Sequence, residues 1–378
     1  MYDFLIIGAG SAGCSMAYFL QKSGKKVAII DREGIAGGAS GVAGAFLSPL
    51  PGKKNSYNSF VNKALDFSID FYENLAPDSV TKKGVLRVPT INFTKEKLED
   101  NDIDYEYFNN EKLHNISKNF KDINGYFYKN AAVIDPLNIC KKMIQNCDFF
   151  IKDIKDLVFK NDAYEIKDLK AKNIILAQGV SKPLIKNSYL EISPIFGLRI
   201  DVKTTTKIPF NIHKSISIST NKDDGTVAIG ATHERPDVTD AECTTTCEKC
   251  IFYIDKEKEQ IDTLLNQASQ LIKLENLEVV KTYKGARASI KSYFPVIGKI
   301  IDFESSLKEY PSIKNGTKIP ENLLKYHPNI YTINALGSRG FVFGPFLAKI
   351  LSENIINDTQ ISQEISTQKL FYKKARKK

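Results

Sequence analysis

Residues 2–31 read YDFLIIGAGSAGCSMAYFLQKSGKKVAIID, and this stretch decides the fold. Apolar residues 2–7 predict a strand, residues 8–13 a glycine-rich turn, and residues 14–23 a helix with one apolar face. Gly24 ends the helix, and residues 26–30 predict a second strand that ends at Asp31. This succession of elements predicts a βαβ unit within a parallel sheet.

The turn after the first strand carries the spacing G-x-G-x-x-G at Gly8, Gly10 and Gly13. Gly8 permits the tight turn, Gly10 lets a pyrophosphate approach the backbone, and Gly13 lets the helix pack on the strand. The unpaired N–H groups of the helix start favour phosphate, and Asp31 stands where a carboxylate binds ribose hydroxyls. The alternative is a glycine turn without a ligand, but the agreement of all four elements favours a dinucleotide.

Two later segments favour FAD over NAD as that dinucleotide. Residues 173–177 predict a strand that ends in an Ala-x-Gly pattern at Ala177 and Gly179, a second contact typical of FAD proteins. Residues 337–340 form another glycine turn before a predicted final helix. The positive end of that helix would stabilise negative charge on a reduced flavin ring.

The rest of the chain alternates helical and extended patterns. Helices are predicted at residues 56–75, 136–147, 254–274 and 343–356, and strands at 83–89, 149–177, 195–232 and 331–334. Residues 90–125 are polar and show no clear period. With 378 residues, the chain is long enough for two domains. We therefore predict an α/β (α+β) fold, in which a Rossmann-like FAD-binding domain accompanies a second, sheet-rich domain.

The composition is that of a globular protein, with 42% hydrophobic and 26% charged residues. No apolar run reaches the roughly 18 residues that a membrane span needs, and residues 1–7 lack the pattern of a signal peptide. We therefore expect a cytoplasmic protein with no membrane partner. The four histidines belong to no recognisable catalytic motif, so a hydrolase triad is not indicated.

The net charge of +9 favours a polyanionic partner such as nucleic acid. A general excess of lysine explains the charge equally well. Residues 369–378 form a basic tail, which either holds phosphates or is a frayed end.

Cys243, Cys247 and Cys250 have the spacing C-x3-C-x2-C, which is also found around iron–sulfur clusters. They lie in an apparent insertion, residues 238–253, and not near the start of a barrel as in radical enzymes. Free cysteines in a reducing compartment are the favoured interpretation, and no metal site is predicted.

Several further segments carry a family resemblance, namely residues 38–41 with 49–50, residues 228–232, residues 287–298 and residues 335–347. With the glycine fingerprint, they make the chain resemble the FAD-dependent oxidoreductase half of the MnmC family of bifunctional tRNA-modifying enzymes. That half belongs to the glycine/D-amino-acid oxidase superfamily. The resemblance covers nearly the whole chain, although residues 42–44 read Val-Ala-Gly where polar residues are expected. The methyltransferase half has no counterpart here, so methylation of the product would need another protein.

The resemblance implies a discontinuous FAD-binding domain at residues 1–83, 131–190 and 285–378. A substrate domain of the D-amino-acid-oxidase type would comprise residues 84–130 and 191–284. The residues expected to contact FAD are Gly8, Ala9, Gly10, Ser11, Gly13, Asp31, Arg32, Gly38, Ala39, Ser40, Ala177, Gly179, Gly298, Gly337, Ser338, Gly340 and Phe341.

Two arginines are the candidates for substrate contact. By resemblance, Arg287 matches the substrate arginine of glycine-oxidase relatives, and its planar fork suits a carboxylate. The alternative role of Arg287 is a structural salt bridge. Arg339 either faces the flavin or substrate, or binds a nearby carbonyl. His233, Lys291 and Tyr293 are weaker candidates for the rim of the pocket.

The resemblance also implies a reaction. The enzyme would oxidise the C–N bond of a carboxymethylaminomethyl group on a tRNA wobble uridine, giving aminomethyluridine and glyoxylate. One alternative is an FAD-dependent oxidase or dehydrogenase of free glycine, sarcosine or D-amino acids. Another is an RNA-binding module that retains the flavin fold without activity. The basic charge favours tRNA weakly.

Overall fold

The computed structural model describes residues 1–99, 102–235 and 256–376. Its first sheet has parallel strands in the order β19, β12, β1, β2 and β9. Their bounds are β1 (Tyr2–Ile7), β2 (Val27–Asp31), β9 (Asp148–Ile151), β12 (Leu169–Leu176) and β19 (Tyr326–Asn334). The antiparallel strands of this sheet are β10 (Val158–Lys160), β11 (Ala163–Ile166) and β18 (Val296–Ile301).

Strand β1 is buried on both faces, as the central strand of a parallel sheet requires. Phe4 and Ile6 pack in one apolar cluster, and Leu5 and Ile7 pack in another on the opposite face. Four helices contribute to the first cluster: α1 (Ser11–Lys22), α3 (Ser56–Leu75), α6 (Pro136–Met143) and α10 (Gly340–Asn357). The predicted βαβ unit is therefore confirmed by the parallel pairing of β1 with β2.

The helix starts follow their capping residues. Asn55 accepts a hydrogen bond from the Asn58 N–H and begins α3 where the apolar spacing predicts it. Asp135 caps α6 in the same way, although the helix ends at Met143 instead of extending to residue 147. Helix α1 begins at Ser11, three residues before the predicted start, because Gly10 already takes the extended N-cap conformation.

The second sheet has eight strands in the order β17, β13, β16, β15, β14, β5, β7 and β6. Their bounds are β5 (Val85–Arg87), β6 (Glu106–Phe108), β7 (Gly125–Tyr128), β13 (Ser193–Lys203), β14 (Asn211–His213), β15 (Ser217–Ile218), β16 (Thr226–Gly230) and β17 (Glu278–Ser289). One face of the sheet is apolar and packs on α8 (Glu257–Ser269), where Ile200, Ile212 and Ile229 surround Leu264. Strand β17 is not predicted from the sequence, because polar side chains occupy both of its faces.

The remaining elements are short. A three-stranded sheet joins β3 (Phe46–Leu47), β8 (Ala132–Ile134) and β4 (Val80–Thr81). The short helices are α2 (Ala39–Val42), α4 (Lys95–Glu99), α5 (Asn110–Ile116), α9 (Phe303–Glu309) and α11 (Thr367–Ala375). Helices α4 and α5 lie within residues 90–125, where the sequence shows no clear period. Each of these helices is too short to establish one.

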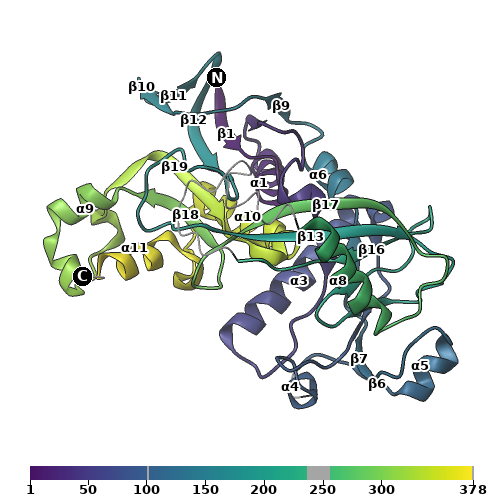
Figure 1. Ribbon diagram of the computed structural model, residues 1–378. Coiled ribbons are helices and arrows are strands. Elements are labelled where there is room, and N and C mark those ends of the chain that lie inside the picture. Colours follow the sequence, from purple (N-terminus) through teal and green to yellow (C-terminus); the bar gives the residue numbers. More distant parts are fainter. Residues whose placement is uncertain (100–101, 236–255, 377–378) are drawn as a thin grey trace.

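Figure 1 shows how these parts are arranged. Strands β1, β10, β11 and β12 of the first sheet lie at the top of the view and β18 and β19 to the left, with α1 and α10 beside them. Strands β13 and β17 of the second sheet run across the middle, and the opposite edge of this sheet, at β6, lies at the lower right beside β7. The cysteines at positions 243, 247 and 250 lie outside the described residues.

The basic tail is a packed helix as far as the structure describes it. Helix α11 buries Phe371 completely, and its ring lies 5.6 Å from Phe303 and 5.9 Å from Tyr189 between centroids. Helix α11 also contacts β18 at the edge of the first sheet. The expectation of a frayed end is therefore wrong through Ala375, because the apolar face of α11 is buried.

We predict that Phe371→Ala lowers the free energy of unfolding by about 3–5 kcal/mol, because it leaves a cavity between α11 and the first sheet. The measurement is urea unfolding of the holoprotein. Lys373→Ala, on the exposed side of the same helix, is the matched control and should change the free energy by less than about 0.5 kcal/mol. Equal, small effects of both variants would show that α11 does not dock.

Candidate active site

The glycine fingerprint is enforced by backbone contacts. Gly8 has φ +110°, and a Cβ there would lie 2.3 Å from the Ala177 carbonyl oxygen. A Cβ at Gly13 would lie 1.8 Å from the Gly8 carbonyl oxygen. Neither position accepts a larger residue, so β1, β12 and the start of α1 meet at van der Waals distance.

Gly10 stands at the open side of this turn. The Ser40 hydroxyl accepts a hydrogen bond of 2.9 Å from the Ser11 N–H, and a Cβ at Gly10 would lie 3.0 Å from the same hydroxyl. Gly10 caps α1 without any side-chain hydrogen bond. The amides of the first turn therefore form a cradle for an anion between residues 10–13 and Ser40.

Asp31 lies beside the same turn. One of its carboxylate oxygens accepts from the Ala9 N–H at 2.8 Å, and the other accepts from the N–H groups of Glu33 and Gly34 at 2.8 and 3.2 Å. The carboxylate thus ties the end of β2 to the fingerprint loop, and its contact with a ribose stays a prediction. Arg32 is exposed and forms an ion pair of 3.0 Å with Glu33.

A second helix start converges on the first. The turn Gly337–Arg339 leads into α10, and a Cβ at Gly340 would lie 3.1 Å from the Ser11 hydroxyl. From α3, the Ser68 hydroxyl donates to the Val342 carbonyl at 2.7 Å, and the Tyr72 hydroxyl donates to the Phe341 carbonyl at 2.9 Å. These buried bonds hold the start of α10 against the start of α1.

The other residues predicted to contact the cofactor do not all lie near the fingerprint loop. Gly38 and Ala39 begin α2, next to Ser40. Gly179 has φ +58°, and its carbonyl accepts from the Asn334 side chain at 3.0 Å, which joins the ends of β12 and β19. Gly298 is different, because the nearest atom to a Cβ there is the Thr367 hydroxyl at 3.1 Å. It packs against α11, and its cofactor contact stays a prediction.

These features fit a dinucleotide. Two helix starts without side-chain caps, the glycine cradle and Asp31 together offer amides for phosphates and a carboxylate for a ribose. The groups that fit the dinucleotide come from the fingerprint loop and from the start of α10, which lie far apart in the sequence.

The face of the second sheet opposite α8 carries a polar row. In-register pairing links Arg87 to His213, His213 to Ser217, Ser217 to Gly230 and Gly230 to Arg199 across five strands. In-register neighbours point to the same face of a sheet. The row therefore gathers basic side chains from strands that are distant in the sequence.

Arg199 in this row is neutralised within the protein. Its guanidinium lies 2.9 Å from the Asp201 carboxylate and 3.8 Å from the centre of the Tyr283 ring. Asp201 also accepts from Lys222 at 3.4 Å. Arg199 thus belongs to a buried network with its own counter-charge, and we assign it a structural role.

Arg87 and Arg339 meet at the segment before α3. Arg87 donates to the Pro49 carbonyl at 3.0 Å, and Arg339 donates to the Ser48 carbonyl at 2.9 Å. Within the described residues, neither forms an ion pair. The contact of Arg339 with a carbonyl is one of the two roles expected for it.

Arg287 lies at the other end of the same face, on β17. Its guanidinium donates to the Thr232 carbonyl at 3.2 Å and has no acidic partner among the described residues. A Cβ at Gly197 on the neighbouring strand would lie 2.6 Å from this guanidinium, so glycine is needed there. The alternative role of Arg287, a structural salt bridge, finds no acidic partner in the described part of the chain, and its contact with a substrate stays a prediction.

The charges of this face influence one another. Burial, followed by the charge of Arg339, lowers the pKa of Arg87 to about 9. Burial, followed by the charges of Arg87 and Arg339, lowers the pKa of His213 well below its ordinary value. Burial and the charge of Arg287 lower the pKa of His233. The arginines therefore carry the positive charge of the site, and His213 is uncharged at neutral pH.

Sequence reasoning missed Arg87 and His213. The available signal is a charged residue inside the apolar run Val85–Arg87, where a strand is predicted. A charged residue in a central strand is buried, and it then needs a partner for its charge. Of the weaker candidates, His233 adjoins Arg287, and Tyr293 is 74% exposed.

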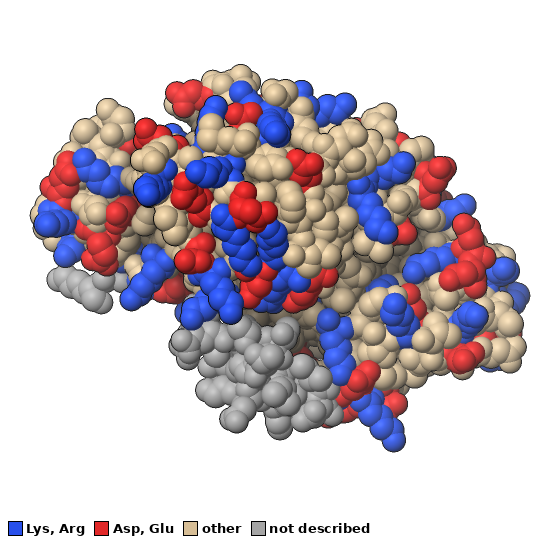
Figure 2. Space-filling view, turned by 90° about the horizontal axis from the view of Figure 1, so that it is seen from above, with Lys and Arg blue, Asp and Glu red and all other residues tan. Residues whose placement is uncertain are grey.

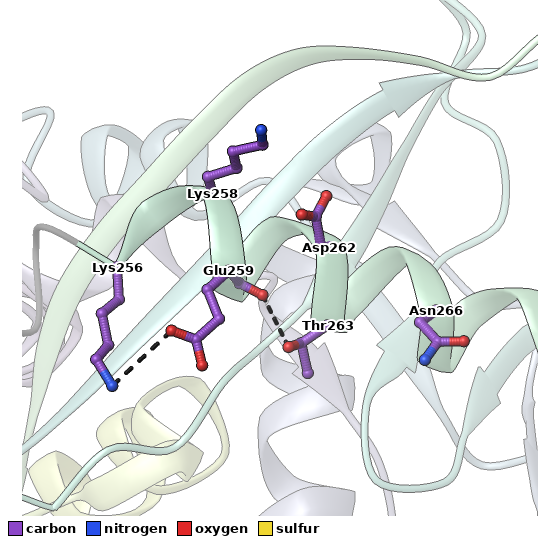
Figure 3. Close-up of a pocket in the computed structure, with 6 residues that line it drawn as sticks. All are labelled: Lys256, Lys258, Glu259, Asp262, Thr263 and Asn266. Carbon is purple, nitrogen blue, oxygen red and sulfur yellow. Dashed lines mark hydrogen bonds and ion pairs between the residues drawn. The ribbon is translucent and has the colours of Figure 1, made fainter.

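Other surface features do not compete with this site. Figure 3 shows a hollow along α8 whose lining includes Glu259 and Thr263 but no arginine. In Figure 2, lysine and arginine side chains are mixed with acidic ones over the face in view. The described residues hold no cluster suited to a metal ion, and none of their helices is long and apolar enough to cross a membrane.

Comparisons with known proteins agree with this architecture. The profile of the family described as FAD dependent oxidoreductase (DAO) matches residues 3–354. The chain is 28% identical, over 94% of its length, to the tRNA 5-methylaminomethyl-2-thiouridine biosynthesis bifunctional protein MnmC of Campylobacter fetus, and 25% identical, over 98%, to that of Leptospira borgpetersenii. It spans 56% and 61% of these two relatives.

Solved structures share the fold. Glycine oxidase from Geobacillus kaustophilus has a TM-score of 0.72 at 14% identity, and each chain is covered to 96%. Iminodiacetate oxidase from Chelativorans has a TM-score of 0.70 at 15% identity, with 96% of this chain and 99% of the other covered. The D-amino-acid-oxidase type of fold predicted from the sequence is thereby confirmed.

We predict that Gly10→Ala weakens FAD binding by at least about tenfold, because its methyl group intrudes into the anion cradle. The measurement is fluorescence titration of the apoprotein with FAD. Ser40→Ala alone and the double variant are the controls. If the double variant binds FAD as tightly as Ser40→Ala, the glycine serves only to accommodate Ser40.

A pH dependence follows from His213. Its pKa is depressed in the folded protein, so the unfolded chain takes up a proton below about pH 6.5 that the native state does not. Stability contributed by this residue is therefore lost as the pH falls below that value. Between pH 7.5 and 5.5, His213→Gln should lose less unfolding free energy than the parent protein, by at most about 1.4 kcal/mol, measured by urea unfolding. Parallel losses would contradict this assignment.

Proposed function

The chain belongs to the DAO family of FAD-dependent oxidoreductases, and from this we propose that it oxidises the C–N bond of a carboxymethylaminomethyl group on a tRNA wobble uridine. The observation that carries the proposal is Arg287, a guanidinium without an acidic partner in the described chain, on the polar face of the second sheet. The similarity to MnmC relatives over nearly all of this chain supports tRNA as the substrate. The net charge of +9 agrees with a polyanion.

The domain assignment is part of this proposal. Residues 1–83, 131–190 and 285–378 would bind FAD, and residues 84–130 and 191–284 would bind the substrate. Membership of the strands in the two sheets supports the division. Strand β17 remains in the second sheet to Ser289, so Arg287 would act from the substrate side of the boundary.

FAD, when bound, accepts the two electrons of the oxidation. The open side of the turn at Gly10 and the start of α10 would hold its phosphates and flavin, and Asp31 would receive a ribose hydroxyl. These residues come from the first sheet and its helices, which leaves the polar face of the second sheet to the substrate.

Arg287 would bind the carboxylate of the substrate, which is in effect an N-substituted glycine. Its fork offers two parallel N–H donors, and the absence of a side chain at Gly197 on the paired strand makes room for the guanidinium. Fixing the carboxylate orients the neighbouring methylene, whose position decides the rate of the oxidation.

The reaction balances with water and, as the two-electron oxidant, the bound FAD. The glycine methylene loses a hydride and the nitrogen a proton, so that a C=N bond forms and two electrons leave the substrate. Water adds to this bond and cleaves it. The products are aminomethyluridine and glyoxylate.

The decisive test is nucleoside mass spectrometry of tRNA that carries the carboxymethylaminomethyl group, before and after incubation with the holoprotein. Loss of this nucleoside and gain of aminomethyluridine is the expected result. An unchanged tRNA, together with bleaching of the flavin by glycine, sarcosine or D-alanine, would identify an oxidase of free amino acids instead. A flavin that none of these compounds reduces would favour an RNA-binding protein without activity.

We predict that Arg287→Ala lowers kcat/KM for that tRNA by about 100-fold or more, because two charge-assisted hydrogen bonds are lost. The absorbance of bound FAD should be unchanged. Arg287→Lys should recover only part of the activity, since an ammonium lacks the fork. Lys281→Ala, an exposed lysine on the same strand, is the control and should stay near the parent value. Loss of FAD in Arg287→Ala would show a structural role.

A further inference from the structure

Arg87 is the most deeply buried arginine of the site. Only 4% of its surface is exposed, and its Nε has no hydrogen-bond partner within the described residues. Its one close bond, at 3.0 Å, is to the Pro49 carbonyl, and a weaker contact of 3.4 Å reaches the Ser48 hydroxyl. A carbonyl and a hydroxyl do not neutralise a guanidinium.

Burying a charge without a counter-ion is expensive, and proteins normally pair such groups. The same sheet demonstrates the usual solution at Arg199, which has the carboxylate of Asp201 at 2.9 Å. Arg87 and Arg339 instead bind the adjacent carbonyls of Pro49 and Ser48, and the charge of Arg339 lowers the pKa of Arg87. Two cations side by side favour an anion between them.

The described neighbours of this pair do not supply that anion. Arg339 is bound to the Ser48 carbonyl, and adjoining titratable groups are Tyr57, Tyr128 and His213. The Tyr128 hydroxyl donates to the Leu98 carbonyl and is not an anion. Burial raises the pKa of Tyr57, so its hydroxyl is neutral, and His213 is uncharged as well. No residue that the structure describes supplies the counter-ion, which points to a ligand.

The position of the pair indicates which ligand it serves. Arg87 is in register with His213 on the polar face, which also carries Arg287 through β13 and β17. Arg87 thus lies on a strand of the sheet assigned to the substrate, and the fingerprint loop follows a strand of the other sheet.

We propose that Arg87 and Arg339 form a second oxyanion subsite, separate from Arg287, which binds a second anionic group of the substrate. This inference rests on one part of the proposed function, namely that Arg287 binds the glycine-like carboxylate. The second group is a carboxylate or a phosphate, both of which suit paired guanidinium groups. In a tRNA substrate it would be a phosphate of the modified nucleotide, and in a free substrate a second carboxylate.

Two matched pairs of compounds test the subsite and distinguish the sources. Sarcosine and iminodiacetate differ by one carboxylate, and 5-carboxymethylaminomethyluridine and its 5′-monophosphate differ by one phosphate. Binding is measured by calorimetry on anaerobic holoenzyme with the flavin already reduced, so that no turnover occurs. We expect the compound with the extra anion to bind at least about tenfold more tightly in one pair, as two charge-assisted hydrogen bonds allow. The pair that shows the preference identifies the source.

Arg87→Gln should remove this preference, and Arg87→Lys should retain part of it. Lys373→Gln on α11 is the control, because it removes the same charge at an exposed position far along the chain. Absence of a preference in both pairs in the parent protein, or an unchanged preference in Arg87→Gln, would overturn the proposal. A change of FAD affinity in Arg87→Gln with the preference intact would assign Arg87 to the cofactor and also overturn it.

The parent protein alone provides a second test, which holds if Arg87→Gln does not fold. At constant ionic strength, sulfate should compete with the doubly anionic member of a pair more strongly than with the singly anionic member. Equal competition would overturn the subsite. Should the tRNA remain unmodified while iminodiacetate keeps its advantage over sarcosine, the proposed function fails and the subsite stands.

Discussion

The close approach of α1 to the ends of β1 and β12 is the constraint on which the rest of the structure depends. It exists because Gly8 and Gly13 have no Cβ, whose atoms would lie 2.3 and 1.8 Å from carbonyl oxygens. With this contact made, the start of α1 opens beside the start of α10, where Ser68 and Tyr72 fix the backbone. The cofactor cradle is thus a consequence of strand and helix packing.

The two faces of the second sheet have different roles. Alternation along the strands sends isoleucines such as Ile212 and Ile229 toward α8, and their neighbours Arg87, His213 and Gly230 to the other side. The apolar face supplies the burial that keeps the sheet folded. The polar face is therefore available for chemistry.

The arginines of that face differ in whether an acidic residue neutralises their charge, and this difference separates structural from functional arginines. Arg199 has Asp201 at 2.9 Å and contributes to a closed network. Arg87, Arg287 and Arg339 contact carbonyl groups instead, which satisfy hydrogen bonds but leave the charge in place. A site with unneutralised guanidinium groups favours anionic ligands, and this agrees with the carboxylate-bearing substrate that we propose.

The sequence by itself determined the parts that depend on near neighbours. The βαβ unit, helix α3 (Ser56–Leu75) and the Asp135 cap follow from spacing within a few residues, and they are confirmed. Only the tertiary structure decided that Arg87 and His213 stand side by side and that α11 packs on the first sheet. Strand order and register set these contacts, and no local pattern encodes them, because pairing joins segments far apart in the chain.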